Sequence, residues 1–174
     1  MNPTAIAMTI AGSDSGGGAG IQADLKTFAA LGVYGTSALT AITAQNTVQV
    51  TASFEIPPKL VKAQIDAVIQ DIKIDAVKTG MLANAKIIEA VVSKIKQYKI
   101  TNLVVDPVMV AKGGDILLRE DAIKVLKETL FSLALIVTPN IHEAEVLTGI
   151  TIKSKTDAIN AIKKIMHQGA KNVL

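Results

Sequence analysis

Hydrophobic residues in this chain fall into two patterns that follow one another along most of its length. Short apolar runs predict strands at residues 5–10, 34–43, 75–79, 103–105 and 133–137. Stretches with apolar residues every three to four positions predict helices at residues 20–31, 57–72, 84–98, 119–131, 141–148 and 155–168. Repeated strand–helix units of this kind predict an α/β fold with a mostly parallel sheet and helices on both of its faces.

Polar side chains follow several of the predicted strands. Asp14, Gln45, Asp106 and Asn140 each stand near the carboxyl end of a different strand. Any one of them could cap a helix or form a turn. Ligands of parallel α/β folds bind outside the carboxyl ends of the strands, so the four together favour one shared site.

A glycine-rich run, Gly16–Gly20, joins the first predicted strand to the first predicted helix. Glycines let the backbone approach a ligand closely, and the helix start offers N–H groups to a polar or anionic group. The run formally matches the Gly-x-Gly-x-x-Ala fingerprint of dinucleotide sites. That fingerprint needs an acidic residue about 20 positions further on, but the first acid after Asp24 is Glu55. The Gly-Lys-Ser/Thr ending of a P-loop is also missing, so the run predicts a small-molecule site of another class.

Asn140 and Glu143 stand one helical turn apart at the start of a predicted helix. Both side chains can therefore face one ion or water cluster. The same spacing also forms a capping box that satisfies the helix N-terminus, and the spacing alone does not decide between these interpretations. With Asp106 at a neighbouring strand end, two carboxylates and an amide would suit a hydrated Mg²⁺ beside phosphates.

The composition limits the classes of function. The chain has 174 residues, of which 49% are hydrophobic, and this predicts one domain or part of one. It has no cysteine, which excludes disulfides and thiolate metal sites. A net charge of +3 and the absence of tryptophan argue against a nucleic-acid partner. No leader-like segment or long apolar run is present, so we expect a cytoplasmic protein without a membrane partner.

Five segments carry a family resemblance. They are residues 11–27, 40–47, 78–81, 106–114 and 138–145. They resemble the hydroxymethylpyrimidine/phosphomethylpyrimidine kinases of thiamine biosynthesis, within the ribokinase-like family. The resemblance implies a three-layer α/β/α sandwich over residues 1–174, ATP and Mg²⁺ as cofactors, and a homodimer. It also implies phosphorylation of 4-amino-5-hydroxymethyl-2-methylpyrimidine and then of its monophosphate.

The same resemblance assigns roles to individual residues. It places the pyrimidine ring between the glycine loop and Met81, with Gln45 bonded to the ring heteroatoms. The substrate-binding residues that it implies are Gly12, Asp14, Ala19, Gly20, Asp24, Gln45, Met81 and Val108. It assigns Asp106, Asn140 and Glu143 to the Mg²⁺–phosphate region, with Asp106 and Glu143 as metal ligands. Lys112 would belong to a flap over the substrate.

One family motif has no counterpart in this sequence. The Gly-Thr-Gly-Cys-like segment, which forms an anion hole at a helix N-terminus, is not found, and residues 169–174 resemble a turn into another strand. We therefore expect a kinase domain that is incomplete at its C-terminus, with little or no activity alone. Full turnover by the 174-residue chain in an ATP-coupled assay would refute this. The alternatives are a pyridoxine or pyridoxal kinase of the same family, a non-catalytic pyrimidine-binding chain, or a subunit completed by a second chain.

Overall fold

The central sheet runs in the order β3-β2-β1-β4-β5-β6. The computed structural model describes residues 4–109, 118 and 120–174. All neighbouring strands pair in parallel except β2 and β3, which are antiparallel. The strands are β1 (Ile6–Asp14), β2 (Tyr34–Gln45), β3 (Val50–Glu55), β4 (Ala76–Thr79), β5 (Leu103–Val105) and β6 (Ile136–Val137). The mostly parallel sheet predicted from the sequence is confirmed.

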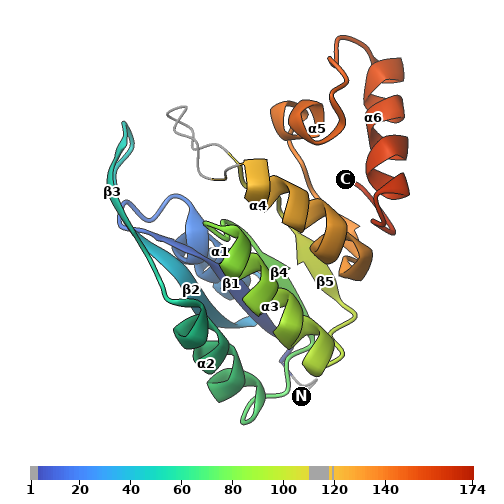
Figure 1. Ribbon diagram of the computed structural model, residues 1–174. Helices are drawn as coiled ribbons and strands as arrows, with labels where there is room; N and C mark the ends of the chain where they lie inside the picture. The colour runs from blue at the N-terminus through green and yellow to red at the C-terminus, as the bar shows by residue number, and fades with distance from the viewer. Residues whose placement is uncertain (1–3, 110–117, 119) are drawn as a thin grey trace.

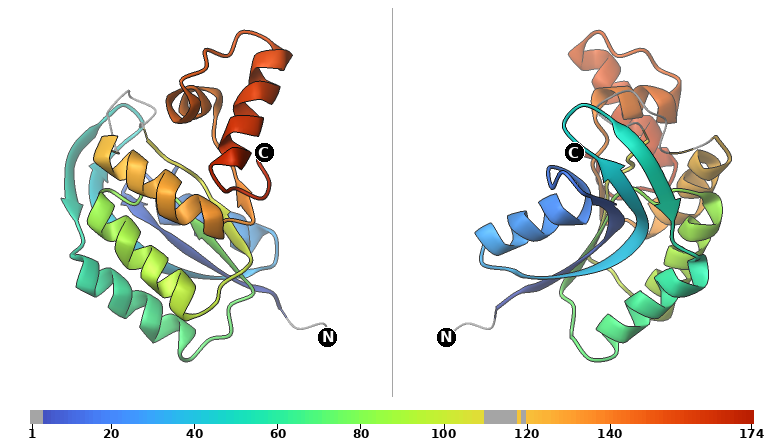
Figure 2. Two further views of the ribbon diagram at one scale, coloured as in Figure 1. Left: turned by 45° about the vertical axis from the view of Figure 1, so that its right-hand side comes forward. Right: turned by 90° about the vertical axis from the view of Figure 1, so that its left-hand side faces the viewer.

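Helices cover both faces of this sheet, as expected. The helices are α1 (Gly20–Ala30), α2 (Pro58–Ile69), α3 (Ala85–Gln97), α4 (Glu120–Val125), α5 (Ile141–Thr148) and α6 (Lys155–His167). Helix α1 lies on one face, and α2, α3 and α4 lie side by side on the other (Figures 1 and 2). Within the described ranges, every helix is too short or too polar to cross a bilayer.

The core explains why the apolar pattern predicted these elements well. Strand β1 lies in the middle of the sheet, and its Met8 and Ile10 are fully buried. Helix α3 buries Ile87 and Val91 against the core. Its start is fixed because the Asn84 side chain accepts a hydrogen bond from the N–H of Ile87 at 2.9 Å.

Strand β3 is the element that was not predicted from the sequence. It forms an antiparallel ribbon with the end of β2, which runs to Gln45 rather than stopping at residue 43. Five of its six residues are exposed, because β3 is the edge strand of the sheet. Residues 50–55 alternate apolar and polar side chains and include Val50, Thr51 and Phe54, so a short strand signal is present in the sequence although no strand was predicted there.

The helix predicted at 119–131 is only partly regular. After α4 the backbone widens into a π-helical turn at Leu126–Leu130 and then tightens into a 3₁₀ turn at Phe131–Leu133. This leaves a shorter β6 than the predicted strand at 133–137. Leu130 and Phe131, at the junction of these two turns, are both fully buried. Val173 forms a parallel bridge to Val137, where the sequence predicts a further strand.

Candidate substrate site

A cavity of about 480 Å³ opens at the carboxyl ends of the strands. One wall is the glycine loop between β1 and α1, and the opposite wall is the β2–β3 ribbon. Its volume suits a small-molecule ligand. The lining includes all eight residues predicted to bind substrate, namely Gly12, Asp14, Ala19, Gly20, Asp24, Gln45, Met81 and Val108. The structure therefore brings the predicted set together, and the binding role of each residue stays a prediction.

Asp14 organises the glycine loop. Its carboxylate accepts hydrogen bonds from the backbone N–H groups of Gly16, Gly18 and Ala19 at 2.8, 2.9 and 2.8 Å. Its own N–H donates to Oε1 of Gln22 at 2.8 Å. Because both carboxylate oxygens are occupied and the residue is buried, Asp14 shapes the cavity wall instead of offering a free charge to a ligand.

Two glycines let the glycine loop lie close to the end of β1 and to Met81. Gly20 has a φ of +55°, and a Cβ at this position would collide with the carbonyl oxygen of Gly12. A Cβ on Gly12 would lie 2.5 Å from Cε of Met81. The absence of both side chains lets the loop pack against β1 and leaves the Met81 thioether beside the loop.

Gln45 ends β2 at the opposite wall of the cavity. Its backbone N–H donates to Oγ of Ser15 at 2.8 Å, and this hydroxyl donates to the Gln45 carbonyl at 2.6 Å. These two bonds join the ribbon to the glycine loop. The side-chain Oε1 accepts a long hydrogen bond from Thr43 at 3.3 Å, and the side-chain NH₂ has no hydrogen-bond partner among the described residues. The amide can therefore donate to a ligand.

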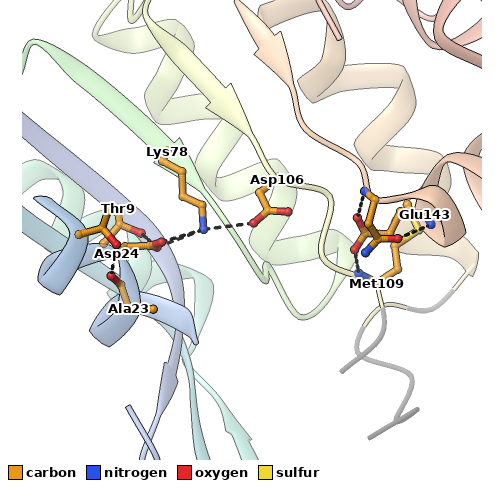
Figure 3. A network of polar contacts seen from close by, with 9 residues as sticks. Thr9, Ala23, Asp24, Lys78, Asp106, Met109 and Glu143 are labelled. Atoms are coloured by element: carbon orange, nitrogen blue, oxygen red, sulfur yellow. Dashed lines mark hydrogen bonds and ion pairs between the residues drawn. The ribbon is translucent and has the colours of Figure 1, made fainter. Parts of the chain in front are cut away.

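Lys78 lies at the centre of an ion network that the sequence did not predict (Figure 3). Its Nζ is 3.1 and 3.2 Å from the carboxylate oxygens of Asp24 and 3.4 Å from Oδ2 of Asp106. The Thr9 hydroxyl donates to Asp24 at 2.6 Å and fixes that carboxylate from the other side. The available signal was a lysine inside a short strand of the central sheet, since a charge that becomes partly buried there needs a partner.

Asn140 and Glu143 form the capping box that their spacing allowed. The Asn140 side chain accepts from the N–H of Glu143, and the Glu143 carboxylate accepts from the N–H of Asn140, both at 2.9 Å. The second Glu143 oxygen accepts from the N–H of Met109 at 3.4 Å. The pair therefore forms the helix cap, and both residues lie outside the cavity lining. Their service to a Mg²⁺–phosphate region stays a prediction.

The two candidate metal ligands sit in poorly solvated surroundings. Burial raises the pKa of the Asp106 carboxyl, the Lys78 ammonium opposes this, and the Asp24 carboxylate adds to it. Burial also raises the pKa of Glu143. The hydrogen bond from the N–H of Asn140 lowers this pKa, and the nearby Asp106 carboxylate raises it further. Among the described residues, no cluster of three or more metal-ligating side chains is found. Lys112, predicted as a flap residue, lies outside the described residues.

Comparison with known proteins decides the family. A family model described as phosphomethylpyrimidine kinase matches residues 14–174. The chain belongs to the phosphomethylpyrimidine kinase family. A hydroxymethylpyrimidine/phosphomethylpyrimidine kinase from Bacillus subtilis is 52% identical over 168 residues. The match covers 97% of this chain and 62% of that relative, so the chain spans less than two thirds of the relative's length.

Solved structures of the phosphomethylpyrimidine kinase family and its neighbours confirm the ribokinase-like fold. The crystal structure of phosphomethylpyrimidine kinase from Clostridium difficile has a TM-score of 0.92 and 50% identity, covering 98% of this chain and 74% of that one. A pyridoxal kinase from Bacillus subtilis, in an ADP complex, has a TM-score of 0.88 and 42% identity, covering 98% and 64%. The likeness to both enzymes keeps the pyridoxal alternative open.

Proposed function

We propose that the protein transfers phosphate from ATP to 4-amino-5-hydroxymethyl-2-methylpyrimidine and then to the monophosphate of that alcohol. The observation that carries this proposal is the cavity that gathers all eight residues implied by the family resemblance. Relatives named for hydroxymethylpyrimidine and phosphomethylpyrimidine support the same acceptor chemistry.

The cavity chemistry suits an aminopyrimidine. The Gln45 amide offers a donor and an acceptor to a ring edge that carries both kinds of group. The Met81 thioether supplies an adaptable apolar surface for a flat ring. Gly12 leaves the space that Met81 occupies, so ring and loop can approach closely.

The cofactors ATP and Mg²⁺ are part of this proposal. Mg²⁺ is held in kinases by one or two carboxylates together with phosphate oxygens and water. Asp106 follows β5 and Glu143 lies in the first turn of α5, and Asp106 is near enough to raise the pKa of Glu143, so the two carboxylates fit this donor set. When bound, Mg²⁺ would neutralise charge on the phosphates. The backbone N–H of Asn140 would hold the Glu143 carboxylate in place, and the Asn140 side chain would cap the helix that carries Glu143.

Binding of the acceptor tests the proposal directly. We expect isothermal titration calorimetry to show that the chain binds the pyrimidine alcohol more tightly than pyridoxal. A Gln45→Leu variant should weaken this binding by roughly tenfold, because the amide loses its hydrogen bonds to the ring. Tighter binding of pyridoxal would favour the pyridoxal kinase alternative. ADP formation that depends on the alcohol tests the transfer step: the 174 residues alone are expected to show little or none, and full turnover would refute that expectation.

We also propose a homodimer in the cytoplasm. Val48 and Phe54 of the β2–β3 ribbon are 76% and 65% exposed, and Ile42 is half exposed. An edge strand with apolar side chains toward solvent is a template for pairing with another chain. Light scattering should therefore give twice the mass of one chain, and Phe54→Lys should halve it. A single-chain mass for the unaltered protein would contradict this proposal.

A further inference from the structure

The two proposed acceptors differ greatly in charge at the reacting position. The alcohol is neutral, whereas a phosphate monoester carries about −1.5 to −2 charges at neutral pH. Besides Asp14, whose oxygens are bonded within the glycine loop, the cavity lining contains the carboxylates of Asp24 and Asp106. Without a compensating cation, these carboxylates would repel the monophosphate and leave the alcohol unaffected.

Lys78 is the basic side chain of this lining within the described residues. It holds its two carboxylate partners unequally. Asp24 contacts the ammonium with both oxygens and is fixed by Thr9, whereas Asp106 contacts it with one oxygen at 3.4 Å. The Asp106 carboxylate has no other hydrogen-bond donor among the described residues. The contact between Lys78 and Asp106 is therefore the one that an incoming anion can replace at least cost.

The surroundings of Lys78 also leave room for such an exchange. The side chain is 22% exposed, so its ammonium reaches the cavity. Gly80 lies directly beside it, and a Cβ on Gly80 would stand 3.0 Å from Nζ. The missing side chain gives the ammonium space to move while Asp24 keeps hold of it.

We propose that Lys78 determines the specificity for the phosphorylated acceptor, by exchanging its contact with Asp106 for one with the ester phosphate. The inference rests on the proposed function, because it concerns the second acceptor of the same cavity. The neutral alcohol leaves the Asp24–Lys78–Asp106 network intact. The monophosphate replaces the contact between Lys78 and Asp106.

The test compares the binding of the two acceptors, without ATP or metal, by isothermal titration calorimetry. Lys78→Met should weaken binding of the monophosphate by roughly ten- to a hundredfold, since a charge-assisted hydrogen bond is lost. Binding of the alcohol should change less than about threefold. Lys78→Arg should retain the preference of the unaltered protein. Lys163→Met removes one exposed positive charge from α6 and serves as the matched control.

A second variant changes the binding in the opposite direction. Asp106→Asn removes the competing carboxylate and should tighten binding of the monophosphate several-fold. This variant tests the inference independently, in case Lys78→Met does not fold. Equal weakening of both acceptors by Lys78→Met would show that Lys78 only positions Asp24, and would overturn the inference. The inference would also be overturned if either variant bound the monophosphate as tightly as the unaltered protein does, or if the unaltered protein did not bind the monophosphate. If the unaltered protein did not bind the alcohol, this result would instead overturn the proposed function.

Discussion

A comparison of two glycines tests how the cavity wall is built. Gly20 and Gly149 both have left-handed backbone conformations, with φ of +55° and +68°. A Cβ at Gly149, which ends α5, would meet no atom within 4 Å. A Cβ at Gly20 would collide with the carbonyl oxygen of Gly12 and stand 3.3 Å from the N–H nitrogen of Asp14. The two alanine variants therefore share the backbone strain and differ in the clash.

The expected magnitudes follow from this difference. A left-handed alanine costs about 1–2 kcal/mol, partly offset because alanine lowers the entropy of the unfolded chain by about 0.4–1 kcal/mol. Gly149→Ala should therefore lower the free energy of unfolding by about 1 kcal/mol. Gly20→Ala adds overpacking of about 1–3 kcal/mol. The atoms in its way belong to the backbone, so no side-chain rotation can relieve the clash.

Urea unfolding of both variants measures the difference, and titration with the pyrimidine alcohol reports the state of the cavity. We expect Gly20→Ala to be less stable than Gly149→Ala by about 2 kcal/mol and to lose most of its binding. Gly149→Ala should bind as the unaltered protein does. If both variants were equally stable and both bound the alcohol, the close approach of the loop to β1 would not be what forms the wall.

Three further predictions concern stability. Asn140→Ala should lower the free energy of unfolding by about 1 kcal/mol through loss of the α5 cap, and an unchanged urea midpoint would contradict this. Hydrogen bonds from Lys94 and Tyr98 lower the pKa of Asp66, so its stabilising effect is present above the ordinary aspartate pKa and lost in acid. The stability gap between the unaltered protein and Asp66→Asn should therefore narrow as the pH falls. Burial raises the pKa of Asp106, so stability should fall as the pH rises through this raised value, and Asp106→Asn should flatten that part of the profile.

The parts of the fold that could be predicted are those with a buried face. Helix α3 and strand β1 place apolar residues at regular spacing against the core, and this spacing is visible in the sequence. Strand β3 pairs with β2 at the edge of the sheet and leaves its side chains exposed, so it has no buried face, and its short apolar–polar alternation was not recognised as a strand. The π-helical turn at Leu126–Leu130 also escaped, because a one-residue change of helical period is lost in a short apolar pattern.

The candidate site divides in the same way. Residues tied to a local sequence pattern, such as Asp14 and Gln45, could be placed at the cavity because each ends a strand. The ion pairs of Lys78 could not be predicted in this way. Asp24 lies 54 residues before Lys78, and Asp106 follows a different strand. Only the order of the strands, with β4 between β1 and β5, brings Asp24, Lys78 and Asp106 together.

The charge that a ligand meets in this cavity therefore follows from pairing and not from composition. Asp14 accepts hydrogen bonds from three N–H groups of its own loop, and Glu143 accepts them from the N–H groups of Asn140 and Met109. Asp24 and Asp106 share a single ammonium, that of Lys78. Of these four carboxylates, Asp14 and Glu143 therefore accept hydrogen bonds from the backbone, whereas Asp24 and Asp106 are paired with a charged side chain. The Lys78–Asp106 contact, at 3.4 Å, is the weaker of the two Lys78 pairings, and the proposed exchange with an anionic acceptor acts at this contact.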